Sequence, residues 1–346
     1  MTIRLANHNA YRLTPAARGT RSWNARVTTV REIGPDILAL QEVVVDERAT
    51  PRVSWEHEAG SLIQDLAEEC GLTATVEVSG GYPHGIAMAA NTHRPWFTAL
   101  MWNPATVQIV KSSYRPFGAT DFWHGCTTAY FDVGAKTLIL VVVYHGDPYR
   151  RNFRHNEGLR LKGIFRTTGG AKPGFCLGDF NSLSAARLQR LWWQLRGSYY
   201  DPEAYLHQRH DDLEYQVPAN RIGKLFLRQL ADRRPTRDLL REGYMVDTAA
   251  HLRAPWEPTV GHWKDGQGDP DPWGPRRIDL ILASRPVVPA LTGYHVHRSA
   301  AALEAADHLP PVLDFDPLEI DRAQGSRPEA RRRGRKLWLP DTRSAA

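Results

Sequence analysis

The sequence predicts an α/β layered fold, and three observations support this prediction. Short runs of β-branched and other apolar residues recur with the length of strands. Helical patterns, in which apolar positions repeat every three to four residues, lie between some of these runs. The two kinds of segment alternate along most of the chain, as in layered α/β proteins. Strands are predicted at residues 3–6, 37–40, 85–90, 98–102, 138–144, 175–177, 278–283 and 312–315, and helices at residues 23–33, 60–70, 154–167 and 184–195.

Residues 1–316 are expected to form one folded domain. The chain has 346 residues, and 42% of them are hydrophobic, which is enough for a large buried core. Residues 199–241 are polar and rich in arginine, and this composition predicts an insertion within the domain. Residues 317–346 are rich in proline and charge and contain the cluster Arg331-Arg332-Arg333-Gly334-Arg335-Lys336, which predicts a basic, disordered tail.

The net charge and the cysteine content indicate the type of binding partner and the cellular compartment. A formal charge of +6 and a pI near 9.3 suit a polyanionic partner such as nucleic acid, although part of the excess lies in the tail. Cys70, Cys126 and Cys176 lack the paired spacing of a zinc ribbon or a disulfide framework. The first residues lack the features of a standard export signal, and no apolar run reaches the ~18 residues of a membrane helix. We therefore expect a cytoplasmic protein without a membrane span.

Polar residues at the ends of predicted strands are the most informative feature, because ligand-binding groups in open sheets gather where strands give way to loops. Asp179 could by itself be a turn former, and His145 could be an ordinary histidine beside a glycine. Asp279 is harder to explain in this way, since a carboxylate within an apolar strand is costly to bury unless it is paired. The candidate site residues are Asn9, Glu42, His145, Asp179, Asn181, Asp279, Asp307 and His308.

In their order along the chain, these residues resemble the motifs of the endonuclease/exonuclease/phosphatase superfamily, whose members include DNase I. The resemblance extends from about residue 3 to residue 315. It implies a four-layered α/β sandwich, in which two mostly antiparallel sheets pack face to face between helices, and it makes residues 1–316 a catalytic domain. The motifs are Leu40-Gln41-Glu42, Gly178-Asp179-Phe180-Asn181, Arg277-Ile278-Asp279 and Asp307-His308.

The resemblance also implies a metal-dependent phosphoesterase. Glu42 would be the principal ligand of Mg²⁺, or of Mn²⁺, and Asn9 and Asp307 would complete or position its coordination sphere; hard oxygen ligands of this kind suit these ions. Asp179 would orient or deprotonate the attacking water, and Asn181 would hold a phosphate oxygen.

Three histidine-related roles follow from the same resemblance. His308 would face the phosphate, while Asp279 would hold the other ring nitrogen and favour the protonated imidazole. His145 would lie near the leaving group. His8 replaces the usual aromatic residue before the first asparagine, which leaves Asn7 as the alternative to Asn9; we prefer Asn9 because of its spacing from the strand.

A nuclease acting on DNA or RNA is the leading functional hypothesis. Arginines near the predicted site could neutralise a phosphate backbone; the alternative, with equal weight for Arg154 and Arg160, is that they belong to solvated helix faces. Trp192 and Trp193 could stack on bases or belong to the core. The alternatives are a phosphomonoesterase, a sphingomyelinase-like or inositol-phosphatase-like hydrolase, and a catalytically silent nucleic-acid-binding module. The arginines in question are Arg150, Arg151, Arg154, Arg160, Arg276 and Arg277.

Overall fold

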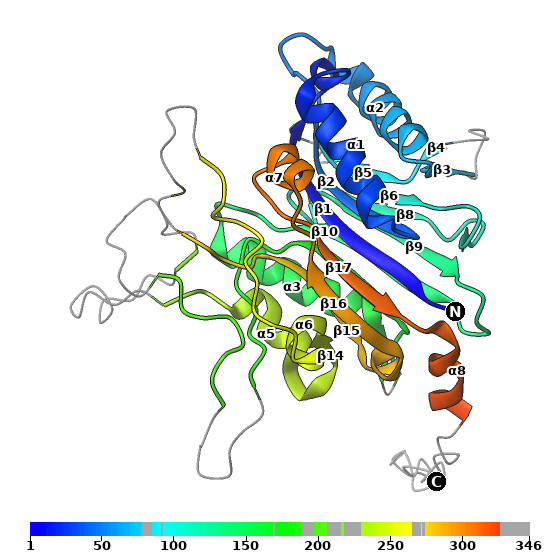
Figure 1. Cartoon of the computed structure of the whole chain (residues 1–346), viewed down its shortest axis with the longest axis vertical. Coiled ribbons are helices and arrows are strands. Elements are labelled where there is room, and N and C mark those ends of the chain that lie inside the picture. The colour runs from blue at the N-terminus through cyan, green and yellow to red at the C-terminus, as the bar shows by residue number, and fades with distance from the viewer. Residues whose placement is uncertain are drawn as a thin grey trace, which may run out of the picture.

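Two β-sheets lie face to face at the centre of the computed structural model of the chain (Figure 1). The structure describes residues 1–77, 85–90, 93–118, 120–168, 170–188, 197–205, 216–217, 230–264, 271 and 274–325. In the first sheet, β1 and β2 are parallel and the other neighbours are antiparallel. Its strand order is β16 (Leu291–Val296), β17 (Pro311–Phe315), β1 (Ile3–Leu13), β2 (Ile37–Val44), β6 (Trp96–Trp102) and β5 (Met88–Ala90).

The second sheet is built in the same way, with one parallel pair, β10 and β13, among antiparallel neighbours. A further strand, β8 (Arg115–Phe117), pairs with β9. The strand order is β14 (Met245–Asp247), β15 (Asp279–Ser284), β13 (Gly174–Asp179), β10 (Ile139–His145), β9 (Cys126–Asp132) and β7 (Gln108–Ile109).

Strand alternation explains why the apolar runs bury both faces of each sheet. Successive side chains of a strand point to opposite faces. Leu5 and Val141 therefore join the core between the sheets, whereas Ala6 and Val142 face outward into the cores under the helices. The outward residues need helices to cover them, which accounts for four layers.

Helices complete the outer layers (Figure 1). The helices α1 (Arg21–Ile33) and α2 (Trp55–Glu69) cover the first sheet, and α3 (Arg151–Phe165) and α5 (Arg234–Leu240) cover the second. The helix α1 begins at the N-cap Thr20, whose hydroxyl accepts a hydrogen bond from the Trp23 N–H, and ends at Gly34 in the left-handed conformation that glycine favours. The predicted four-layered sandwich is confirmed.

Shorter elements join these layers. They are β3 (Thr75–Val76), β4 (Gly85–Ile86), β11 (Arg166–Thr167), β12 (Gly170–Ala171), α6 (Thr248–Leu252), α7 (Ala300–Ala305), α8 (Pro317–Gly325) and the 3₁₀ turns Pro15–Ala17, Arg52–Ser54, Arg241–Gly243 and Arg285–Ala290. Within the described ranges, no helix has both the length and the apolar character needed to cross a bilayer.

Some predictions differ from the structure. A helix was predicted at residues 184–195, but residues 184–188 are not helical, and Arg187 instead forms an isolated β-bridge with Tyr199. The segment Pro317–Gly325, which we placed in the tail, forms α8; the rest of the tail, Trp192–Trp193 and most of the 199–241 insertion lie outside the described residues. The end of that insertion forms α5, which packs against α3.

Candidate active site

Six of the eight candidate residues line one pocket of about 500 Å³. Sheet register brings several of them together, because His145 pairs with Asp179 across β10 and β13, and Asp179 pairs with Asp279 across β13 and β15. Asn9 and Asp279 lie directly behind the pocket, buried against its lining residues. The six that line it are Glu42, His145, Asp179, Asn181, Asp307 and His308.

The backbone around the pocket is strained. Among the described residues, six that are not glycine have positive φ angles, and four of these line the pocket: Tyr11 (47°), Arg12 (48°), Glu42 (60°) and Asn181 (46°). Such conformations cost energy and persist where the surroundings impose them, often at functional sites. Here they direct backbone N–H groups to carboxylates, since the Arg12 N–H lies 3.0 Å from Glu42 Oε2 and the Asn181 N–H lies 2.7 Å from Asp179 Oδ1.

Oxygen donors gather on one side of the pocket, which we call the acidic side (Asn9, Glu42, Asp307). Asn9 Nδ2 lies 3.2 Å from Glu42 Oε1 and 3.2 Å from Asp179 Oδ2. Burial and the charge of Asp307 raise the pKa of Glu42, and Asp307 Oδ1 is buried without a hydrogen-bond partner. Carboxylates held together in this way suit a divalent cation, which would neutralise both charges.

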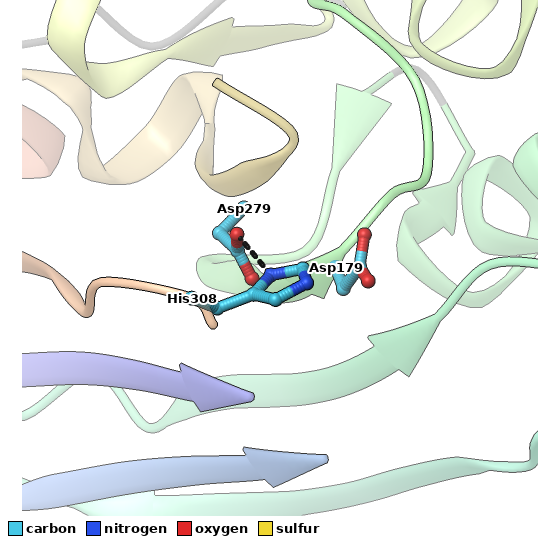
Figure 2. Close-up of side chains that lie close together, drawn as sticks. All are labelled: Asp179, Asp279 and His308. Atoms are coloured by element: carbon cyan, nitrogen blue, oxygen red, sulfur yellow. Dashed lines mark hydrogen bonds and ion pairs between the residues drawn. The ribbon is translucent and has the colours of Figure 1, made fainter. Parts of the chain in front are cut away.

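His308 lies between the carboxylates of Asp279 and Asp179, as Figure 2 shows. Its Nδ1 is 2.7 Å from Asp279 Oδ2, and Asp279 is fully buried. Burial by itself would lower the pKa of His308, but the charges of Asp279 and Asp307 and the hydrogen bond to Asp279 raise it well above its usual value. The imidazole is therefore held as a cation, with Nε2 3.9 Å from Asp307 Oδ1.

Asp279 and His308 also belong to a second group of atoms that could bind a metal ion. One atom each of Asp179, Asp279 and His308 lie within 4.8 Å of one another, a spacing that a metal ion could bridge. However, His308 Nδ1 already forms a charged hydrogen bond with Asp279, and that bond would break if both atoms bound one ion. The oxygen donors of the acidic side fit Mg²⁺ better, because this ion prefers oxygen ligands.

Hydrogen bonds from β1 and β2 of the facing sheet hold Asp279 in place. Asn7 Nδ2 lies 3.4 Å from Asp279 Oδ1, and Gln41 Nε2 donates to Asn7 Oδ1 at 2.8 Å. Asn7 thus supports the carboxylate that charges His308, whereas Asn9 contacts Glu42 and Asp179 directly. Of the two asparagines, Asn9 is therefore the one that contacts the other groups proposed for the chemistry, Glu42 and Asp179.

Asp179 and Asn181 lie where β13 ends. Burial raises the pKa of Asp179 to about 7; the charge of His308 opposes this shift and the charge of Asp279 reinforces it. A carboxylate that titrates near neutral pH can accept a proton from water and release it again. Asn181 donates from Nδ2 to the Gly146 carbonyl at 3.0 Å, which ties the loop after β13 to the loop after β10.

The opposite side of the pocket is aromatic. His145 Nε2 lies 3.6 Å from Asp179 Oδ2, and the ring of His145 stacks on His124 with centroids 4.2 Å apart and an interplanar angle of 19°. Burial lowers the pKa of His124 to about 4 and lowers that of His145 well below its usual value. Both imidazoles are therefore neutral at pH 7, in contrast to His308.

The remaining residues that line the pocket were not predicted from the sequence. His124 precedes Gly125, whose φ of 86° and close approach to the Ala89 carbonyl require a glycine, and this His-Gly pair before a strand was the one available signal. The other missed residues carry no motif, because they come from the end of β1, the start of β6 and loops between other elements. They are Tyr11, Arg12, Arg94, Trp96, Trp123, Pro148 and Tyr149.

The arginines predicted to crowd the site have structural roles instead. Arg277 is fully buried between Asp201 (Nε–Oδ1, 2.8 Å) and Asp247 (Nη2–Oδ2, 2.6 Å). Arg154 is also fully buried and donates to the Asp147 carbonyl at 2.6 Å. The prediction that these side chains neutralise a phosphate backbone is wrong, because buried guanidinium groups cannot reach one.

The other four predicted arginines also form ion pairs or hydrogen bonds within the protein. Arg276 is 5% exposed and pairs with Asp271, and the more exposed Arg150 and Arg160 pair with carboxylates. Arg151 donates to the Val217 carbonyl at 2.8 Å. The two arginines that line the pocket, Arg12 and Arg94, are exposed, and Arg94 pairs with Glu47 at 3.1 Å.

Comparisons with known proteins identify the family of the chain and proteins that share its fold. The sequence model described as the Endonuclease/Exonuclease/phosphatase family matches residues 7–308. No curated protein sequence shows significant similarity to the chain.

Solved structures share the fold at low sequence identity. A protein described as an endonuclease/exonuclease/phosphatase from Bacteroides vulgatus is 14% identical and aligns with a TM-score of 0.53 over 91% of this chain and 99% of its own. A conserved protein of unknown function from Enterococcus faecalis V583 is 13% identical, with a TM-score of 0.51 over 90% and 98% of the two chains. An endonuclease/exonuclease/phosphatase from Beutenbergia cavernae DSM 12333 is 16% identical, with a TM-score of 0.50 over 91% and 71%.

Proposed function

The chain belongs to the Endonuclease/Exonuclease/phosphatase family, and we propose that it is a Mg²⁺-dependent phosphoesterase that hydrolyses phosphodiester bonds of DNA or RNA. One observation carries the proposal: Glu42, Asp179 and His308, which lie far apart in the sequence, line the same pocket. A carboxylate for a metal, a carboxylate for water and a charged imidazole for the phosphate are the groups that phosphoester hydrolysis requires.

The acidic side would hold the metal ion. Glu42 and Asp307 supply carboxylate oxygens, and Asn9, whose Nδ2 lies 3.2 Å from Glu42 Oε1, positions the Glu42 carboxylate; burial and the negative charge of Asp307 raise the pKa of Glu42. When bound, a divalent cation stabilises negative charge on the phosphate and its leaving oxygen. Mn²⁺ has the same ligand preference and should substitute for Mg²⁺.

The remaining groups would carry out the proton and charge chemistry. Asp179 takes a proton from the attacking water as the water oxygen bonds to phosphorus and the ester P–O bond breaks. His308, charged by Asp279 at 2.7 Å, stabilises the phosphoryl oxygens through Nε2. His145 stays neutral and forms a hydrogen bond with the leaving oxygen, while Asn181 holds a phosphate oxygen with its amide.

Nucleic acid is the favoured substrate class for electrostatic reasons. The chain carries a formal charge of +6, and two exposed arginines, Arg12 and Arg94, line the pocket. Cations in these positions attract a phosphate backbone. The modest pocket volume of about 500 Å³ favours a second candidate, hydrolysis of a small phosphate monoester.

One substrate screen tests both candidates. The wild type and Asp179→Asn are incubated with DNA, RNA, phosphate monoesters and sphingomyelin, with Mg²⁺, with Mn²⁺ and with EDTA. We expect EDTA-sensitive cleavage of nucleic acid that the variant loses by roughly 10²–10⁴-fold. Hydrolysis of monoesters alone would establish the phosphatase, and a wild type that binds nucleic acid without cutting it would establish a silent binding module.

A further inference from the structure

Four rings form a continuous aromatic wall in the pocket (Trp96, Trp123, His124, His145). Trp96 lies 5.4 Å from His124 between ring centroids, and His124 stacks on His145 at 4.2 Å. Trp123 follows next to His124, with its ring centroid 6.3 Å away. The wall therefore leads directly to His145, the imidazole that faces Asp179.

Trp123 is held in place from two directions. Its backbone N–H donates to Glu157 Oε1 at 2.7 Å. The guanidinium of Arg150 lies over its ring, 4.2 Å from the centroid, and Arg150 is itself anchored by Asp147. A ring restrained in this way loses little conformational freedom when a ligand stacks on it.

Packing alone does not account for the wall. The core tryptophans Trp23 and Trp102 are 1% and 3% exposed, whereas Trp96 and Trp123 are only partly buried and line an open pocket. Large aromatic rings exposed within a concave site are typical of ligand recognition.

The lining also indicates the chemistry of the ligand. Among the described residues that line the pocket, none is Val, Leu, Ile, Met or Phe, and Pro148 is its one aliphatic side chain. An acyl chain would find little aliphatic surface there. A planar, polar ring attached to a phosphate matches the combination of aromatic rings with Arg12 and Arg94.

We propose that the aromatic wall binds the base of an unpaired nucleotide whose phosphate lies between His308 and His145. This inference rests on the proposed phosphoesterase function and specifies its substrate. Stacking on an aromatic side chain requires an accessible base face, which neighbouring base pairs cover in a duplex. The preferred substrates are therefore single strands, and any base is accepted because every base has a π-face.

Cleavage of two single-stranded oligonucleotides of equal length tests the proposal, one with ordinary bases and one with abasic residues throughout. For the wild type, we expect the KM to be on the order of tenfold lower for the strand with bases. Trp123→Leu should remove this difference by raising the KM of that strand, with kcat and the abasic strand little changed, and Trp123→Phe should restore most of it.

Trp55→Leu is the matched control, because Trp55 is also partly buried beneath an arginine, with Arg52 5.9 Å from its ring centroid, but lies outside the pocket. It should behave as the wild type. Equal KM values of the wild type for the two strands would overturn the base-binding proposal, whereas failure to cleave either strand would overturn the proposed hydrolysis of nucleic acid itself.

Inhibition of the wild type gives a second measurement that does not depend on the folding of a variant. Nucleoside monophosphates should inhibit at concentrations on the order of tenfold lower than ribose 5-phosphate, which carries the phosphate without a base. Equal inhibition by the two compounds would contradict a role of the wall in binding bases.

Discussion

The acidic and aromatic sides of the pocket each carry a buried histidine, but in opposite charge states. His308 has Asp279 at 2.7 Å and Asp307 at 3.9 Å, and its pKa is raised. His145 stacks on His124, and its pKa is lowered. Burial disfavours the charge on both rings, so the difference comes from their neighbours.

Burial is the main reason that His145 does not become charged, and the positive charge of His308 lowers its pKa further. Asp179 lies 3.6 Å away, but burial raises its own pKa to about 7, so it carries only part of a negative charge at neutral pH. Asp279, by contrast, hydrogen-bonds His308 directly. Environments that drive similar groups apart in pKa assign acid and base roles. Here they place a cation beside Asp307 and neutral rings along the aromatic wall, which suits the phosphate and the uncharged base of the proposed substrate.

The largest effect is expected from removing the charged imidazole. His308→Gln keeps an N–H donor for Asp279 but cannot carry positive charge, and kcat should fall by roughly 10³-fold. His297→Gln is the matched control, since His297 pairs with Glu32 at 3.0 Å outside the pocket and should retain wild-type kcat. A His308→Gln variant within tenfold of the wild type would remove His308 from the chemistry.

The second largest effect on kcat is expected when the negative charge of Asp279, the hydrogen-bond partner of His308, is removed. Asp279→Asn removes the negative charge that raises the pKa of His308, so kcat should fall by about 10²-fold. Activity should also be lost at lower pH than in the wild type, because the imidazole releases its proton earlier as the pH rises. A pH–rate profile measures both changes. Asp238→Asn breaks a similar pair with His155 outside the pocket and should leave the profile in place.

A smaller effect is expected for the acidic side. Glu42→Gln retains the shape of the side chain but removes its charge, and the Mg²⁺ concentration for half-maximal activity should rise at least about tenfold. Calorimetric titration of the protein with Mg²⁺ gives a measurement independent of turnover. Unchanged affinity in this variant would exclude Glu42 as the principal ligand, and Glu58→Gln provides a carboxylate control outside the pocket.

The last prediction concerns stability and not activity. Glu157 lies behind the aromatic side and accepts hydrogen bonds from the Trp123 and Asp147 N–H groups. Burial raises the pKa of Glu157 from 4.5 to about 7, despite its hydrogen bonds. The folded state therefore holds a proton that the unfolded state releases, and stability falls by ~3 kcal/mol as pH rises through this window.

Urea unfolding at pH 4.5 and pH 7 measures this contribution. Glu157→Gln cannot titrate, so its free energy of unfolding should fall less than that of the wild type over the same interval. Identical pH dependence in the two proteins would show that Glu157 is ionised in the folded state.

Much of the fold could be predicted from local patterns. Apolar strand-length runs and helical periodicity located the central strands and three of the four predicted helices. The strand at residues 126–132 was missed because Cys126–Asp132 mixes threonine and tyrosine with apolar residues without regular alternation, and its burial depends on pairing with β10. The helix predicted at residues 184–195 does not form at residues 184–188, where Arg187 pairs with Tyr199 instead.

Arginines show why local sequence says little about electrostatic roles. Arg277 stands beside Asp279 in a motif and was predicted to meet phosphate, yet it is buried against Asp201 and Asp247. Asp201 lies 76 residues away in the chain, and no short-range pattern identifies such a partner. The same limitation applies to Trp123 and His124, which enter the pocket through long-range packing.

The sequence by itself determined the layered architecture and the polar residues that end its strands, because hydrophobic periodicity and motif order are local properties. Only the tertiary structure decided which of these groups meet. Asn9 reaches Asp179 across 170 residues, and His308 reaches Asp279 across 29. The charge of a buried side chain depends on its distance from water and from other charges, and folding sets those distances.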